Sequence, residues 1–229
     1  MKLSASTFIL FFLIAICHSI SGQKTDLTCF NKIDVSSGID VELVLDKSCG
    51  IEWTLENIEP EKVVTKIEDK TLKLRTKFGI HKDAVIKAKV YYNELIALTA
   101  TGRSVVWSEE ELYLENITFL LGNGGEARLN VHADTLNATL AEGSVITLEG
   151  EARVIDVSVG TGATFSGYNL DSKVAKVFSN SGGKAKIAVS ENLYAKATSK
   201  GFVGFIGEPE FLVKDATLGG EISQTIKEQ

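Results

Sequence analysis

The chain has 229 residues with a hydrophobic fraction of 44%, 24 Lys and Arg, 30 Asp and Glu, and a formal net charge of −6. This acidic balance argues against sequence-independent nucleic-acid binding, which requires a basic surface, and the apolar fraction is too high for a disordered chain. Twenty Gly with only two Pro favour a β protein with many tight turns over a helical bundle.

The first 22 residues have the organisation of a secretory signal peptide. Lys2 supplies a positive charge, Phe8–Ile16 form an apolar run, and small residues follow at Ser19, Ser21 and Gly22. The run is too short to span a bilayer, which needs about 20 apolar residues, and no later stretch approaches that length. We therefore expect cleavage after Ser21 or Gly22, export of the mature chain, and no transmembrane helix.

Two cysteines remain once Cys17 is removed with the signal peptide. Cys29 and Cys49 are an even number in an oxidising compartment, which favours a disulfide over two buried free thiols. Cys29 precedes a strand expected over residues 30–35, and Cys49 follows one expected over residues 41–45. If these two strands run antiparallel, their outer ends meet and the cysteines can pair.

Residues 23–93 predict a β-rich leading section without regular spacing. Alternating apolar residues indicate strands over residues 41–45, 51–55, 63–67, 72–74 and 85–92, and Glu68-Asp69-Lys70 indicates a hairpin turn. No linker rich in Pro, Gly or Ser follows this section. We therefore expect a single domain over residues 23–229, in which repeated coils occupy residues 94–229.

A repeat organises the second part of the chain. Glycines recur at intervals of 22, 19, 19, 20, 19 and 19 residues, each preceded by an alternating apolar run: Gly102, Gly124, Gly143, Gly162, Gly182, Gly201 and Gly220. Period-2 alternation is typical of a strand with one buried face, and short strands in units of this length must stack on one another to bury that face. An antiparallel sandwich would not require such constant spacing.

These features predict an all-β fold, a right-handed parallel β-helix (β-solenoid) with coils of about 19–20 residues. Inner positions are often small, as at Ala138 and Ala163, which suits a narrow interior. The repeated glycines are expected at the coil corners, where the backbone takes positive φ. Leu140 and Val159, one coil apart, are expected to be stacked neighbours on the inner wall.

Several motifs resemble those of the putative auto-transporter adhesin, head GIN domain family of secreted bacterial proteins. They are the opening Phe30-x-Lys32-Ile33-Asp34-Val35-Ser36-Ser37-Gly38-Ile39-Asp40-Val41-Glu42-Leu43, then Asp69-x-x-Leu72-x-Leu74, Leu95-x-x-Leu98-x-Ala100-x-Gly102, Gly207-Glu208-Pro209 and Gly219-Gly220. The resemblance covers residues 29–224 and implies a β-solenoid and an exported location, but no established activity. The family's Gly-Gly loop is reduced here to Ser199-Lys200-Gly201.

No motif predicts catalytic, cofactor-binding or metal-binding residues. The mature chain has two histidines, His81 and His132, and neither belongs to a cluster with metal-ligand spacing. Gly160-Thr161-Gly162 begins like a dinucleotide-binding fingerprint, but it lacks the third glycine and the helix that follows in such sites. It is better explained as a coil corner.

Charged residues at coil-like intervals are the main candidates for a polysaccharide-acting site. Glu126, Arg128, Glu142, Glu151 and Arg153 could stack as a ladder, and neighbouring coils could hold two carboxyls about 5–9.5 Å apart, as a glycosidase requires. The same pattern is also that of an ordinary solvated face.

Basic residues gather in the leading section. Lys73, Arg75, Lys87 and Lys89 occupy alternate positions of two expected strands, so they could form a basic face for acidic glycans or envelope lipids. Alternatively, these strands neighbour the acidic segment 34–61 and the opposite charges pair.

Three functions remain open from the sequence. The first is an exported, non-enzymatic interaction or adhesin-like module of a bacterial cell envelope, with an envelope glycan or protein as partner. The second is a β-helical polysaccharide-acting enzyme. A groove of clustered carboxylates and aromatics would support this function. The third is a structural or assembly protein that uses its solenoid ends. An exposed apolar end would support this function.

Overall fold

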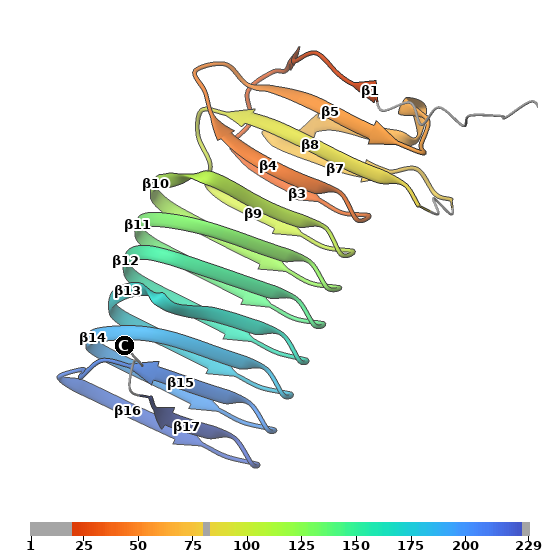
Figure 1. Ribbon diagram of the computed structural model, residues 1–229. Helices are drawn as coiled ribbons and strands as arrows, with labels where there is room; N and C mark the ends of the chain where they lie inside the picture. Colours follow the sequence, from red (N-terminus) through yellow and green to blue (C-terminus); the bar gives the residue numbers. More distant parts are fainter. Residues whose placement is uncertain (1–19, 80–82, 226–229) are drawn as a thin grey trace, which may run out of the picture.

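The computed structural model describes residues 20–79 and 83–225. Most of the expected signal peptide, residues 1–19, lies outside this part, as does His81. All 17 described strands belong to one hydrogen-bonded sheet that winds into a parallel β-solenoid (Figure 1). The fold class expected from the sequence is therefore confirmed.

Five long strands form the body of the solenoid. They are β10 (Val105–Leu121), β11 (Glu126–Leu140), β12 (Val145–Val159), β13 (Thr164–Ser179) and β14 (Lys184–Ala197). Each pairs in parallel with the next, and each bends midway, so that one strand supplies both arms of a coil (Figure 1). Leu140 pairs with Val159, 19 positions later in the chain, as the repeat predicted.

The inner wall combines large and small side chains along the solenoid axis. In one inner row Ala127, Ile146, Phe165 and Ala185 follow one another in register, and all four are fully buried. Because interiors pack at crystal-like density, a phenylalanine in one coil needs a small neighbour in the next. The recurring inner alanines of the sequence supply that room.

Tight turns join the long strands along the edge opposite the bends (Figure 1). Each turn places two adjacent residues at positive φ, as at Glu142 (φ 54°) and Gly143 (φ 70°), which is the geometry of a type I′ turn. Five of the seven expected corner glycines have φ between 60° and 74°: Gly102, Gly124, Gly143, Gly162 and Gly182.

Positive φ at Gly201 and Gly220 was expected, and this expectation is wrong. In these two turns the second left-handed residue is Lys200 (φ 64°) or Gly219 (φ 75°), and the expected glycine comes one position later. A Cβ atom on Gly201 would lie 2.3 Å from the carbonyl oxygen of Ser179. Glycine is therefore required there by close backbone approach between coils rather than by φ.

The leading section is interleaved with the solenoid rather than simply placed before it. Its strands are β1 (Ile20–Ser21), β2 (Thr25–Asp26), β3 (Lys32–Val35), β4 (Asp40–Leu45), β5 (Gly50–Glu56), β6 (Val63–Glu68), β7 (Thr71–Thr76), β8 (Val85–Tyr92) and β9 (Ala97–Ala100), with a 3-10 turn η1 (Pro60–Lys62). β3 lies between β7 and β9, and β4 lies between β8 and β10, all in parallel. The coil formed by β3 and β4 is thus enclosed by coils that come later in the chain.

The strands at 30–35 and 41–45 do not take the antiparallel arrangement considered from the sequence as one way to bring the cysteines together. β3 and β4 do not pair with each other, since each joins parallel neighbours on a different arm. Antiparallel pairing occurs instead where β5 meets β8 and where β6 meets β7 across the hairpin turn at Asp69-Lys70. β1 and β2 also pair antiparallel with β5 and cover this end of the solenoid.

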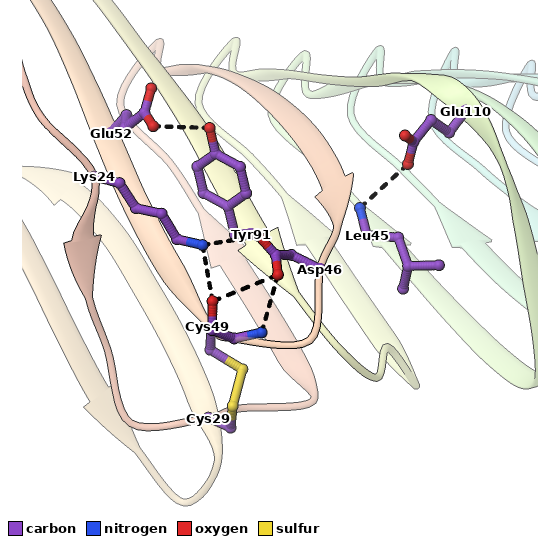
Figure 2. Close-up of polar contacts among 9 residues, drawn as sticks. Lys24, Cys29, Leu45, Asp46, Cys49, Glu52, Tyr91 and Glu110 are labelled. Atoms are coloured by element: carbon purple, nitrogen blue, oxygen red, sulfur yellow. Dashed lines mark hydrogen bonds and ion pairs between the residues drawn. A yellow bond between two sulfur atoms is a disulfide. The ribbon is translucent and has the colours of Figure 1, made fainter.

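Cys29 and Cys49 form a disulfide at this closed end, with their Cα atoms 5.1 Å apart (Figure 2). A small polar cluster lies beside it. Lys24 Nζ donates to Asp46 Oδ2 at 2.9 Å and lies 4.2 Å from the ring centre of Tyr91, while the Tyr91 hydroxyl donates to Glu52 at 2.8 Å (Figure 2). Burial and the nearby carboxylate of Glu52 raise the pKa of Tyr91 to about 12.

At the other end of the solenoid, none of the described strands covers the last coil, and we call this end the open end. Its strands are β15 (Phe202–Ile206), β16 (Phe211–Ala216) and β17 (Glu221–Gln224). All six residues of β16 are exposed, and Phe211, Leu212 and Val213 keep 49%, 41% and 42% of their surface accessible. The two ends therefore differ, one covered by antiparallel strands and one presenting apolar side chains. Among the described residues, no helix has the length and apolar character needed to cross a membrane.

Candidate functional site

A row of functional side chains follows the bends of the long strands. Tyr113 of β10 pairs in register with His132 of β11, His132 with Glu151 of β12, and Glu151 with Asp171 of β13. The parallel register thus stacks a phenol, an imidazole and two carboxylates on one edge. We call this edge, comprising the outward side chains of residues 111–116, 130–134, 149–153, 169–173 and 190–191, the bend edge.

Tyr113 and His132 form an aromatic stack on the bend edge. Their rings stack with centroids 4.7 Å apart and planes 10° apart. The His132 nitrogens lie 3.4 Å from Glu111 and 3.3 Å from Glu151, and the Tyr113 hydroxyl donates to Glu111 at 2.7 Å. The hydrogen bond to Glu111 raises the pKa of Tyr113. Both rings are therefore held in fixed orientations by carboxylates.

Ion pairs continue the row toward the open end. Arg153 donates to both carboxylate oxygens of Asp134, at 2.6 and 2.9 Å, and this guanidinium lowers the pKa of Asp134. One coil further, Lys173 lies 3.2 Å from Glu191. Both pairs join adjacent coils. They neutralise Asp134 and Glu191, whereas further carboxylates, such as Glu151 and Asp171, keep the bend edge acidic.

Two adjoining hollows lie among these side chains. One, of about 420 Å³, is lined by residues that include Asp134, Glu151 and Arg153. The other, of about 910 Å³, extends toward the open end, and both are lined by Asp171, Ser172 and Ser190. The bend edge therefore offers a depression with a mixed polar and apolar lining that spans several coils.

The ladder expected from Glu126, Arg128, Glu142, Glu151 and Arg153 is divided among three places. Glu126 and Arg128 pair with each other at 2.6 Å on β11, and Glu142 lies in a tight turn on the opposite edge. Only Glu151 and Arg153 reach the bend edge. Within the described ranges, no group of three or more His, Cys, Asp or Glu is arranged to hold a metal ion.

The possible basic face of the leading section is interleaved with carboxylates. Lys73 lies 2.8 Å from Glu68, and Lys89 lies 3.1 Å from Glu42. Lys87 is the register partner of Asp40 on the neighbouring strand. The geometry therefore favours the alternative in which acidic and basic strands pair, and Arg75 adds a single exposed charge.

Sequence reasoning missed the Tyr113–His132–Glu111 contacts. A signal was present, because Tyr113, His132 and Glu151 are separated by 19 residues each, the same interval as the glycines. Following polar residues at the coil interval would have joined them. Glu111 lies two residues before Tyr113, so its contacts with Tyr113 and His132 do not fall at the coil interval and leave no such periodic signature.

The chain belongs to the family described as "Putative auto-transporter adhesin, head GIN domain", which matches residues 29–209. This confirms the resemblance seen in the sequence motifs. Among functionally curated proteins, none matches this sequence.

Solved structures share the fold at low sequence identity. A putative adhesin from Bacteroides fragilis NCTC 9343 has a TM-score of 0.76 at 17% identity, covering 90% of this chain and 96% of that one. A putative adhesin from Parabacteroides merdae ATCC 43184 has a TM-score of 0.70 at 17% identity, covering 90% of this chain and 96% of that one. A protein from Parabacteroides distasonis ATCC 8503 is described as a putative lipid binding protein. It has a TM-score of 0.66 at 18% identity, covering 89% of this chain and 96% of that one.

Proposed function

We propose that this protein is an exported, adhesin-like binding module of a bacterial cell envelope that acts without catalysis. The observation that carries the proposal is the bend edge, where the coil register aligns acidic, basic and hydroxyl side chains around two hollows and places Tyr113 and His132 in the same row. Parallel backbone ladders make this edge rigid, so its side chains are preorganised for recognition. Membership of the family and the signal-like first 22 residues support export.

A polysaccharide-acting enzyme is less well supported by the electrostatics. A catalytic acid at neutral pH needs a carboxyl with a raised pKa beside the scissile bond. Burial raises the pKa of Asp40, but Asp40 is paired in register with Lys87 in the leading section, away from the bend edge. At the bend edge, Arg153 lowers the pKa of Asp134 instead. We therefore favour binding over hydrolysis.

The test is a binding screen of the exported protein on envelope and host glycans, matrix proteins and liposomes. A double variant, Glu151→Gln with Asp171→Asn, is expected to weaken binding about tenfold, whereas Glu126→Gln on β11 serves as a matched control. Charge reversal at Lys73, Arg75, Lys87 and Lys89 tests the basic-face alternative. Release of reducing ends from a bound polysaccharide, abolished by Glu151→Gln, would contradict a non-catalytic role.

A second candidate function, assembly through a solenoid end, is favoured by one specific observation. β16 presents Phe211, Leu212 and Val213 at the open end, and edge strands with exposed apolar side chains readily pair with further strands. Light scattering at increasing concentration should then detect oligomers. Val213→Lys should abolish them, whereas Leu120→Lys, at an exposed leucine of β10, should not.

A further inference from the structure

A third hollow lies where β10 leaves the leading section. β10 pairs with β4 through Val105–Trp107 and with β9 through Thr118–Leu121; among the described residues, no strand pairs with the stretch between on that side. Leu45 N–H bridges part of this gap by donating to Glu110 at 3.3 Å (Figure 2). The remaining space is a hollow of about 220 Å³.

Tyr113 forms one wall of this hollow. One face of its ring is stacked on His132 in the following coil, while the hollow lies on the side of the preceding coil, where residues 93–96 and Leu45 line it. The Tyr113 side chain is 73% exposed. Its hydrogen bond to Glu111 and its stack on His132 fix the ring before any ligand arrives, so its second face is a preorganised platform.

The polar groups around the platform define the chemistry of a ligand. Glu94, Glu111 and Asn116 line the hollow together with the apolar side chains of Leu45 and Ile96. Carboxylate oxygens accept hydrogen bonds from hydroxyl groups, and an amide both donates and accepts. The same carboxylates repel phosphate, sulfate and uronate groups. The hollow is therefore suited to a hydroxyl-rich ligand with an apolar face and no negative charge.

We propose that this hollow binds one pyranose unit of an uncharged glycan, stacked on the free face of Tyr113. The C–H face of the sugar ring covers the aromatic ring, and its hydroxyls donate to Glu94 and Glu111, an arrangement of apolar lining with a few convergent polar groups. This inference rests on the proposed binding function and names a ligand class for it, at a position separate from the two larger hollows.

The test measures binding of neutral hexasaccharides of glucose, mannose and N-acetylglucosamine to the exported protein, by calorimetry and by saturation-transfer NMR. Tyr113→Ala should weaken binding about tenfold or more. Tyr113→Trp, which keeps an aromatic platform, should retain binding. Tyr194→Ala removes another exposed tyrosine, on β14, and should change nothing. Circular dichroism checks that each variant is folded.

Each other outcome would overturn the inference. Neutral glycans could fail to bind, or bind equally well to Tyr113→Ala, or bind less strongly than choline, which would indicate an aromatic site for cations. The broader proposal is judged separately. If the protein binds matrix proteins, liposomes or acidic glycans but not neutral glycans at Tyr113, the proposed binding function is supported and the pyranose site is wrong.

Discussion

Left-handed backbone conformations recur at every tight turn, and the residue that adopts them varies. Gly124, Gly143, Gly162 and Gly182 occupy the second central position of their turns, whereas Lys200 occupies it between β14 and β15 with φ of 64°. An L-residue other than glycine in this region costs about 1–2 kcal/mol. Side chains are therefore retained against backbone preference at the second central position of two turns, at Arg103 and Lys200, and at the first central position of others, as at Glu142.

Gly143 offers a clean measure of that backbone cost. A Cβ atom at this position would meet nothing within 4 Å, so substitution changes backbone energy and not packing. We expect Gly143→Val to lower the free energy of unfolding by about 1–2 kcal/mol, measured by urea denaturation. Gly143→Asn should cost less, because asparagine tolerates this region. Equal losses in both variants would argue for a steric origin.

The ionisation of Glu68 makes the stability of the fold depend on pH. Ion pairs with Lys66 and Lys73 lower the pKa of Glu68 from 4.5 to about 2. A carboxyl with a depressed folded-state pKa contributes stability above its unfolded pKa and loses it as the pH falls toward the folded value. We therefore expect Glu68→Gln to reduce stability at pH 7, with the difference disappearing between about pH 4.5 and pH 2.

Urea unfolding at several pH values provides the measurement. The control is the double variant Lys66→Met with Lys73→Met, in which Glu68→Gln should have little effect at any pH because the charges that depress the pKa are gone. A difference between wild type and Glu68→Gln that persists unchanged at pH 2 would show that the substitution acts through packing.

Among the structural elements, the long strands could be predicted and the order of the leading strands could not. β11 and β12 follow from alternating residues that recur after 19 positions, as in Leu140 and Val159. By contrast, Ile33 of β3 pairs with Leu72 of β7, although β4, β5 and β6 come between these two strands in the sequence. Such a pairing leaves no periodic trace, because any apolar strand could fill it, and it is decided by tertiary packing.

The candidate site was predictable to a similar extent. The coil interval connects Tyr113, His132 and Glu151, so the row itself could be derived from spacing. The hollow beside Tyr113 could not, because it exists only where β10 passes from β4 to β9. That gap depends on the order of the leading strands, which the sequence pattern leaves open.

The closed end should depend on the Cys29–Cys49 disulfide. The bridge ties the start of the leading section to β5 across 20 residues, and closing a loop of that length contributes about 3 kcal/mol in the chain-entropy model. We expect Cys29→Ala with Cys49→Ala to lose that amount in urea unfolding, and wild type under reducing conditions to match the variant. Two thiols titrating in the folded protein under non-reducing conditions would contradict the prediction.

The whole molecule should be least stable at its open end. β12 is paired along both edges, whereas β16 is paired with β14 on one side and has all of its residues exposed. Local opening is easiest where few apolar contacts hold a strand. We expect amide hydrogens of β16 to exchange about 100-fold faster than those of β12, measured by hydrogen–deuterium exchange with mass spectrometry.

Protein concentration provides the control for this gradient. If β16 is covered by a second copy, its protection should rise with concentration, while that of β12 stays constant. Equal and concentration-independent protection of β12 and β16 would show that the end is not the weak point of the fold.

The unbroken register between β11 and β12 has a consequence for how such a chain can change in length. An inserted copy of residues 126–144 would continue every inner and outer row, lengthening the wall by one strand spacing of about 4.8 Å. An insertion of one residue would have to be absorbed near the bend, as happens in β13 between Ser166 and Asn169, the register partners of Thr147 and Glu149. The distance between two contact residues on the bend edge can therefore increase only in multiples of one coil, about 4.8 Å each.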